Sequence, residues 1–167
     1  MTVFSANIQR SFLGRLSNIF ALTGGFVMLG IAAVTVASII GRTTVGQSIE
    51  GDYEITEMGL AMAVFLFLPV CYVRNGHVIV DLFTAHCKKS TLRTLDITAD
   101  IVFTVTAFVF AYQMSLSGFE AKDYLEQSML LELPTWWTFI VGVTSMTLCG
   151  LCGLYKLFAV FLGGANE

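Results

Sequence analysis

The stretch RNGHVIVD, Arg74 to Asp81, lies near the centre of the chain and separates two long apolar segments. Asn75 and Gly76 are typical of a helix end, because glycine enters the left-handed conformation there without a Cβ clash. After this stop, one face of the next helix would be apolar, with Val78, Ile79, Leu82 and Phe83. The stretch therefore predicts that a membrane helix ends here and that an amphipathic interfacial helix follows over about residues 77–88.

The polar residues of this stretch can fix the turn. Asp81 can pair with Arg74 across the turn or with His77 one helical turn back, and Gly76 supplies the helix stop. We therefore assign a structural role to Arg74, Gly76, His77 and Asp81. The alternative is an ordinary loop with solvated charges. If the turn is structural, Asp81→Ala lowers the stability of the protein.

The composition identifies an integral membrane protein. Hydrophobic residues make up 56% of the 167 residues and charged residues only 13%. The mean hydropathy is +0.77, far above what the polar surface of a soluble domain of this size allows. The slightly acidic chain offers no basic face, so nucleic acid is not an expected partner.

Four charge-free runs each predict one transmembrane helix, over about residues 18–41, 52–74, 98–119 and 134–156. The second run, Met58 to Val73, would rise only ~24 Å as a helix, which is short of the hydrocarbon core. That helix must therefore begin near Asp52. This start carries Glu54 and Glu57 into the interface or against a partner subunit, and acids there suit the positive end of the helix dipole.

The basic residues predict the orientation. Arg42 and Lys122 fall on one side of the membrane and the other seven on the opposite side, namely Arg10, Arg15, Arg74, Lys88, Lys89, Arg93 and Lys156. By the positive-inside rule both termini and the central loop are cytoplasmic. We therefore expect an all-α membrane protein with a single domain over residues 1–167, four transmembrane helices and one interfacial helix.

The two outer loops are acidic. Their carboxylates either complement the positive-inside bias or form a docking surface for a partner with basic patches. These acids are Glu50, Asp52, Glu54 and Glu57 in the first loop and Glu120, Asp123, Glu126 and Glu132 in the second. Trp136 and Trp137 follow Pro134 at the start of the last span, where indoles suit the headgroup level. With Glu54 and Glu57, these tryptophans are candidate anchors or subunit contacts.

The residues point away from catalysis and from a bound cofactor or metal. Cys149 and Cys152 form a CxxC pair inside an apolar helix, where packing of small side chains is the expected role. His77 and His86 both fall in the loop, whereas a membrane haem protein needs histidines within its spans. This disfavours a membrane anchor for a redox enzyme. Gln113 is expected to form an interhelical hydrogen bond.

Three motifs resemble one family. GDYEITE, Gly51 to Glu57, is similar to the opening of its second span, and YVRNGHVIVDLF, Tyr72 to Phe83, resembles its Arg, Gly-His, Val-Asp signature. LPTWW, Leu133 to Trp137, resembles the start of its last span. In this order within four spans, the motifs resemble the DctQ-type small permease subunit of a tripartite ATP-independent periplasmic (TRAP) transporter.

The resemblance implies a non-enzymatic accessory subunit in a bacterial inner membrane. Its partners would be a large polytopic permease subunit, a periplasmic substrate-binding protein and membrane lipids. With a binding protein as partner, the resemblance makes five acids of the outer loops the candidate docking residues, namely Glu50, Asp52, Glu120, Asp123 and Glu126. The complex would take up an organic anion, such as a C4-dicarboxylate or sialic acid, with a sodium gradient. The alternative is an autonomous four-helix multidrug-type exporter, but that class needs a glutamate within its first span, and residues 19–40 contain none.

Overall fold

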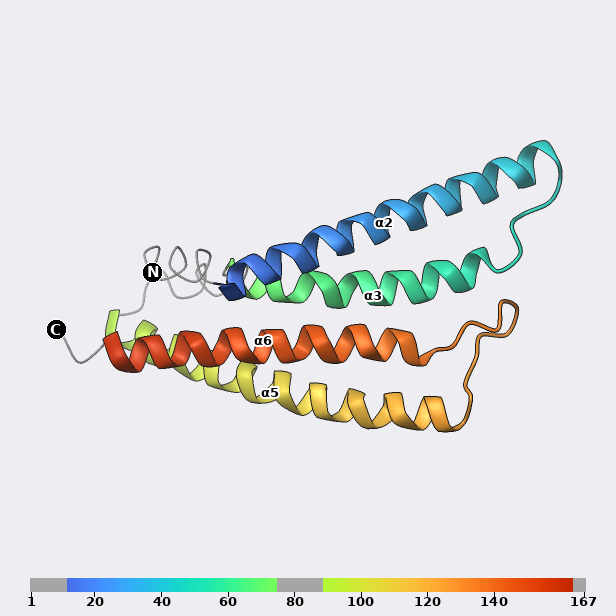
Figure 1. The fold of residues 1–167 in the computed structure, drawn as a ribbon. Helices are drawn as coiled ribbons and strands as arrows, with labels where there is room; N and C mark the ends of the chain where they lie inside the picture. The colour runs from blue at the N-terminus through green and yellow to red at the C-terminus, as the bar shows by residue number, and fades with distance from the viewer. Residues whose placement is uncertain (1–11, 75–88, 164–167) are drawn as a thin grey trace.

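The structure, a computed structural model, describes residues 12–74 and 89–163. These residues form four α-helices (Figure 1), namely α2 (Phe12–Thr44), α3 (Asp52–Val73), α5 (Lys89–Asp123) and α6 (Trp136–Gly163). All four are long and apolar enough to cross a membrane, so the prediction of an all-helical protein with four spans is confirmed. The interfacial helix expected over about residues 77–88, with Gly76, His77 and Asp81, lies outside the described residues.

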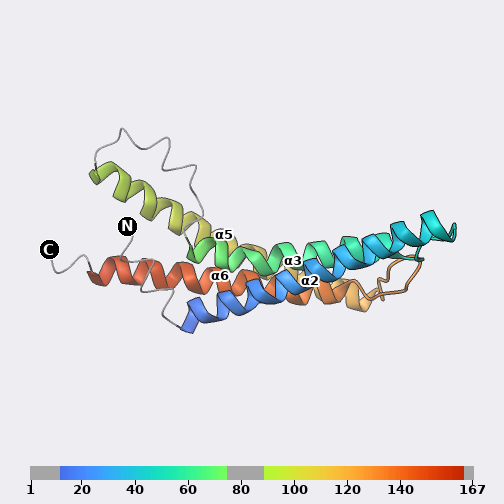
Figure 2. The same cartoon turned by 90° about the horizontal axis from the view of Figure 1, so that it is seen from above.

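The helices lie in the order α2, α3, α6, α5 (Figure 1). The main packing pairs are α2 with α3, α3 with α6, and α6 with α5, while α2 touches α6 less extensively. The first part of α5 swings away from the other helices when the molecule is seen from above (Figure 2). The outer helices α2 and α5 therefore each have one main neighbour, and α3 and α6 form the centre.

The two ends of this layer differ. One end, here the loop end, carries the α2–α3 and α5–α6 connections, and the other, the terminal end, carries the start of α2 and the end of α6 (Figure 1). Arg15, Arg74 and Lys156 belong to the terminal end, and Arg42 and Lys122 to the loop end. The side of the membrane that each end faces stays a prediction.

The start of α3 follows from its sequence. Gly51 precedes the helix with φ 77° and ψ 10°, a left-handed conformation that favours glycine. Asp52 and Glu54 lie in the first turn, where carboxylates interact favourably with the positive end of the helix dipole. At the other end, the backbone N–H of Arg74 still donates to the carbonyl of Val70 at 3.0 Å. The helix is thus long enough to cross a bilayer because it includes the acidic turn.

Small residues let the helices approach closely. A Cβ on Gly59 of α3 would lie 2.8 Å from the side chain of Ile31 in α2. A Cβ on Gly153 of α6 would lie 2.2 Å from Thr104 Oγ1 in α5. Because apolar surface gains little from leaving lipid, this close contact is what holds membrane helices together.

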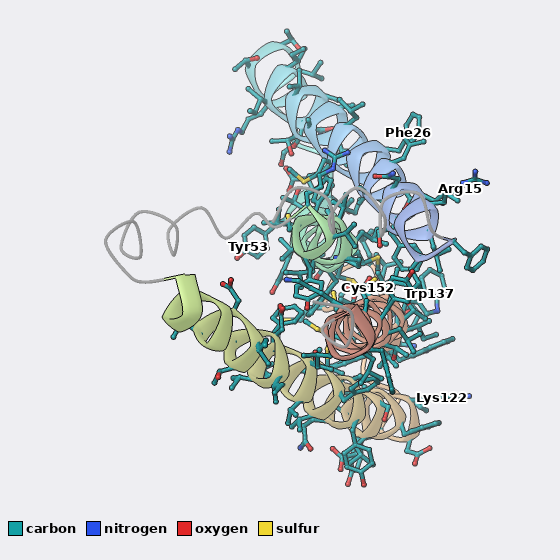
Figure 3. The ribbon with its side chains drawn as sticks, turned by 90° about the vertical axis from the view of Figure 1, so that its left-hand side faces the viewer. Arg15, Phe26, Tyr53, Lys122, Trp137 and Cys152 are labelled. Atoms are coloured by element: carbon teal, nitrogen blue, oxygen red, sulfur yellow. The ribbon has the colours of Figure 1, made fainter. Side chains whose placement is uncertain are left out.

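The outer faces remain apolar. Arg15 and Phe26 of α2 point away from the other helices, whereas Cys152 lies in the centre (Figure 3). Phe26 is 66% exposed and Cys152 is fully buried. Similar apolar side chains of α5, such as Val105, Val109 and Phe119, are also exposed. These faces require a covering of lipid or of another protein.

Candidate functional site

The loop end is organised around the carboxylate of Glu54. It accepts hydrogen bonds from Ser128 Oγ at 2.5 Å, from the backbone N–H of Leu130 at 2.8 Å and from that of Leu131 at 3.0 Å. Ser128, Leu130 and Leu131 lie in the connection between α5 and α6, while Glu54 belongs to the first turn of α3. One side chain thus fixes the α5–α6 connection to the start of another helix.

The α5–α6 connection, residues 124–135, also has internal order. The Ser128 N–H donates to the Leu133 carbonyl at 2.9 Å, and Gln127 and Pro134 form an isolated β-bridge. Leu125 and Glu132 adopt φ values of 51° and 52°, which are unusual for residues with a side chain. The connection is therefore a defined structure held by several backbone hydrogen bonds.

The α2–α3 connection is fixed to the same place. A Cβ on Gly51 would lie 2.4 Å from the side chain of Leu131, so the two connections touch. Ser38 of α2 donates its hydroxyl to Asp52 Oδ2 at 2.5 Å and accepts the Ile49 N–H at 3.3 Å. The first turn of α3 thereby joins both connections into one surface.

All of the candidate docking residues belong to this loop end, and they fall into two groups. Glu50, Glu120, Asp123 and Glu126 are exposed. Asp52 is half-buried, and its carboxylate accepts the Ser38 hydroxyl. Asp52 therefore resembles Glu54 in having an internal partner, whereas the four exposed acids present their charge to the surroundings.

An apolar tip on the α5–α6 connection was not anticipated from the sequence. Met129 is 97% exposed and Leu130 70%, beside the exposed Tyr124 and Leu125. The pattern that could have indicated it is SMLLELP, Ser128 to Pro134, in which three consecutive large apolar residues interrupt an acidic loop. Such residues in a fixed loop are suited to contact another molecule.

The candidate anchor residues occupy the edges of the loop end. Trp136 is the first residue of α6 and stands edge-on to Trp137, with ring centroids 6.2 Å apart. The Lys122 ammonium lies 5.8 Å from the centroid of the Trp136 ring, within the range of a cation–π interaction. Trp137 and Glu57 are exposed. These positions suit contact with headgroups or with another subunit.

The terminal end contains a second polar cluster, which the sequence analysis did not assemble. Asp100 Oδ1 accepts Lys156 Nζ at 2.9 Å and the Tyr72 hydroxyl at 3.0 Å. The Tyr72 ring stacks on Phe103 with centroids 4.3 Å apart. Asp100 is half-buried, so α3, α5 and α6 meet at one charged centre. In the sequence, Asp100 and Lys156 lie at the ends of two predicted spans on the same side of the membrane. This shared position was the signal that could have indicated the cluster.

Arg74 also lies at the terminal end. Its Nη2 atom lies 3.5 Å from Asn18 Oδ1 of α2 and donates a long hydrogen bond. The expected pairing of Arg74 with Asp81 falls on a residue outside the described part of the chain. Arg74 therefore links the end of α3 to the start of α2 in the structure.

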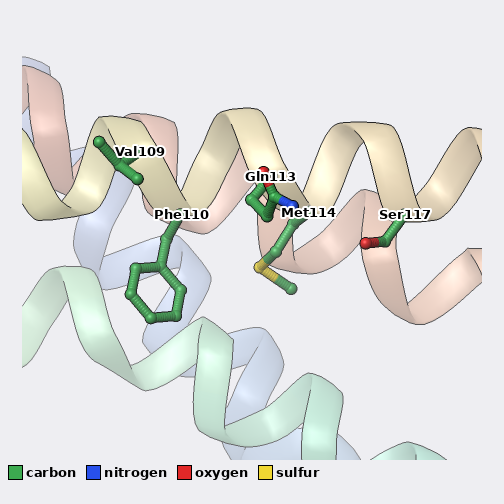
Figure 4. A pocket seen from close by; sticks show the side chains of 5 residues that line it. All are labelled: Val109, Phe110, Gln113, Met114 and Ser117. Carbon is green, nitrogen blue, oxygen red and sulfur yellow. The ribbon is translucent and has the colours of Figure 1, made fainter.

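The polar residues within the apolar helices include Cys149, Cys152 and Gln113. Cys149 and Cys152 are fully buried, and Cys152 Sγ lies 3.9 Å from Ser17 Oγ of α2. Gln113 is exposed on α5 and lines a shallow groove with Val109, Phe110, Met114 and Ser117 (Figure 4). Within the described residues it makes no hydrogen bond from its side chain, so the interhelical bond expected for Gln113 is absent. Over the same residues, no three His, Cys, Asp or Glu side chains group as metal ligands.

The chain matches a known family over most of its length. The sequence model of the family described as "Tripartite ATP-independent periplasmic transporters, DctQ component" matches residues 31–163. No curated protein and no solved structure matches the chain. The matched region includes three of the four helices in full and the whole loop end. The chain therefore belongs to the DctQ family, a family of transporter components rather than enzymes, and is the small membrane subunit of a TRAP transporter.

Proposed function

We propose that this chain is the scaffold of its transporter: it holds the large permease subunit in the bilayer and helps to dock the periplasmic substrate-binding protein. The loop end faces the periplasm, and both termini lie in the cytoplasm of a bacterial cell. The complete complex then takes up an organic anion, such as a C4-dicarboxylate or sialic acid, with a sodium gradient.

The observation that carries the scaffold role is the open layer of helices. A closed four-helix bundle would shield one face of each helix, but here α2 and α5 each pack mainly on one neighbour. Six large side chains of α2 illustrate the apolar surface that remains, namely Ile19, Leu22, Phe26, Leu29, Val36 and Ile40. A surface of this kind gives a larger membrane subunit room to pack.

The docking role is supported by the division of the acids at the loop end. Asp52 and Glu54 accept internal hydrogen bonds and hold the connections in place. Glu50, Glu120, Asp123 and Glu126 are exposed around that fixed surface. Exposed charges of one sign steer an oppositely charged partner and set the rate of encounter. The exposed acids are therefore the proposed contacts for basic patches on the binding protein.

Co-purification tests the scaffold role. The tagged chain, extracted from its native membrane in mild detergent, is expected to carry a large polytopic membrane protein in a fixed ratio. Recovery of a lone antiparallel dimer of this chain would instead support a small exporter, and a haem spectrum would support a redox anchor.

Charge reversal tests the docking role in reconstituted vesicles. Changing Glu120, Asp123 and Glu126 together to lysine should slow uptake about tenfold when the binding protein is limiting and the salt concentration is low. Uptake should recover when the binding protein is in excess. Matched Gln and Asn changes keep side-chain size and should have a smaller effect. Unchanged uptake with all three lysines would contradict the docking role.

A further inference from the structure

A groove lies between α5 and α6 at the loop-end half of these helices. It has a volume of about 280 Å³, and all of its lining residues come from these two helices. Its walls include the apolar residues Gly118, Phe119, Phe139 and Ile140. Phe119 is 68% exposed and Ile140 51%, so the groove opens on the apolar outer surface of these two helices.

The groove has a polar end. Lys122, in the last turn of α5, and Trp136, the first residue of α6, line it where the helices meet the loop end. The Lys122 ammonium lies over the indole of Trp136. In the described part of the chain no carboxylate forms an ion pair with Lys122, since the one such pair there joins Lys156 to Asp100. An exposed cation therefore stands at the mouth of an apolar groove.

The length of the groove fits one leaflet of a bilayer. Along α5 it extends from Met114 to Lys122, and along α6 from Trp136 to Thr144. Eight residue steps of an α-helix rise about 12 Å. Half of a hydrocarbon core of about 30 Å is roughly 15 Å. A chain lying in the groove would thus run from the headgroup level nearly to the middle of the bilayer.

We propose that this groove binds one glycerophospholipid, with an acyl chain between α5 and α6 and the phosphate on Lys122. The tryptophan at the same level suits the headgroup region. Glu120 and Asp123 flank Lys122 in the sequence and disfavour a headgroup that is only anionic. They favour phosphatidylethanolamine, which carries an ammonium group beside its phosphate. This inference depends on the membrane location of the chain and not on the proposed docking role.

Native mass spectrometry of the full chain tests the site. The chain is reconstituted in vesicles of equal parts phosphatidylethanolamine, phosphatidylglycerol and phosphatidylcholine, then released in mild detergent. One phosphatidylethanolamine should remain bound to the unaltered chain. Lys122→Gln should lower the retained fraction about tenfold, because a charge-assisted contact to phosphate is lost. Arg42→Gln, which removes the other cation of the loop end, should leave retention unchanged.

A second variant and a labelling experiment address the acyl chain. Thr144 is exposed at the deep end of the groove, so Thr144→Trp should fill it and also lower retention. Because this variant could fold poorly, a phospholipid with a photoreactive group on its acyl chain is used on the unaltered chain as well. Cross-links should map to Phe119 and Ile140.

Two results would overturn the proposal. The first is equal lipid retention by the unaltered chain and Lys122→Gln, and the second is cross-links confined to other helices. If the first result comes with weaker co-purification of a large membrane protein in Lys122→Gln, the groove is a subunit contact. Stronger retention of phosphatidylglycerol than of phosphatidylethanolamine would overturn the proposed headgroup.

Discussion

Each end of the molecule contains a carboxylate that accepts several hydrogen bonds, but the two carboxylates have different kinds of partner. At the terminal end, Asp100 accepts hydrogen bonds from side chains of α3 and α6. At the loop end, Glu54 accepts hydrogen bonds from Ser128 and from the backbone of a connection. Asp100 thus joins helices to one another, whereas Glu54 orders a surface. Substitution of Asp100 should therefore change the stability of the fold, and substitution of Glu54 should change the local order of the α5–α6 connection.

The largest effect is expected at the terminal end. Asp100→Ala removes the acceptor shared by Lys156 and Tyr72, and the loss of hydrogen bonds involving a charge should lower the free energy of unfolding by about 2 kcal/mol. Thermal unfolding in detergent measures this change. Asp123→Ala, which removes an exposed acid from the other end of the same helix, should have little effect. Equal stability of the two variants would show that the Asp100 cluster does not hold the helices together.

The contact between the two connections is expected to come next. Gly51 and Gly46 both have positive φ, at 77° and 75°, so alanine is strained by about 1 kcal/mol at either position. Only a Cβ on Gly51 meets another side chain, that of Leu131, while nothing lies within 4 Å of a Cβ on Gly46. Gly51→Ala should therefore reduce stability by about 1 kcal/mol more than Gly46→Ala. Thermal unfolding of the two variants measures the contribution of the contact between Gly51 and Leu131. Equal losses of stability in the two variants would argue against this contact.

Removing only the hydroxyl of Tyr72 is expected to have a smaller effect than Asp100→Ala. Tyr72→Phe keeps the stacking on Phe103 but loses the hydrogen bond to Asp100, which should cost about 1 kcal/mol of unfolding free energy. Tyr112→Phe serves as the control, because Tyr112 is exposed on α5. If both variants unfold at the same temperature, the Tyr72 hydroxyl contributes nothing to the terminal end.

The smallest effect on overall stability should come from the Glu54 carboxylate. Glu54→Gln weakens the acceptor for Leu130 and Leu131, so hydrogen exchange at these two amides should quicken about tenfold while the helices exchange as before. Glu57→Gln, an exposed change one turn further along α3, is the matched control. Unaltered exchange at Leu130 and Leu131 would mean that the connection is ordered without Glu54.

The sequence predicted the positions of the helices better than it predicted which helices pack against each other. Long charge-free runs identify spans because a bilayer sets their length, and the shortness of the run after Glu57 placed the start of α3 at Asp52. The order of packing was not accessible, since small residues occur on every span. The role of Glu54 was also hidden, because its partners lie 74 to 77 positions away and two of them are backbone N–H groups without a residue preference.

The central proposal is that the loop end, and not the terminal end, contacts the binding protein. Hydrogen exchange of the assembled membrane complex, with and without the binding protein, tests it most directly. We predict protection in residues 45–50 and 124–133, with no change in residues 95–104 or 152–159. Protection confined to residues 95–104 and 152–159, or no protection anywhere in this chain, would contradict a binding-protein contact at the loop end.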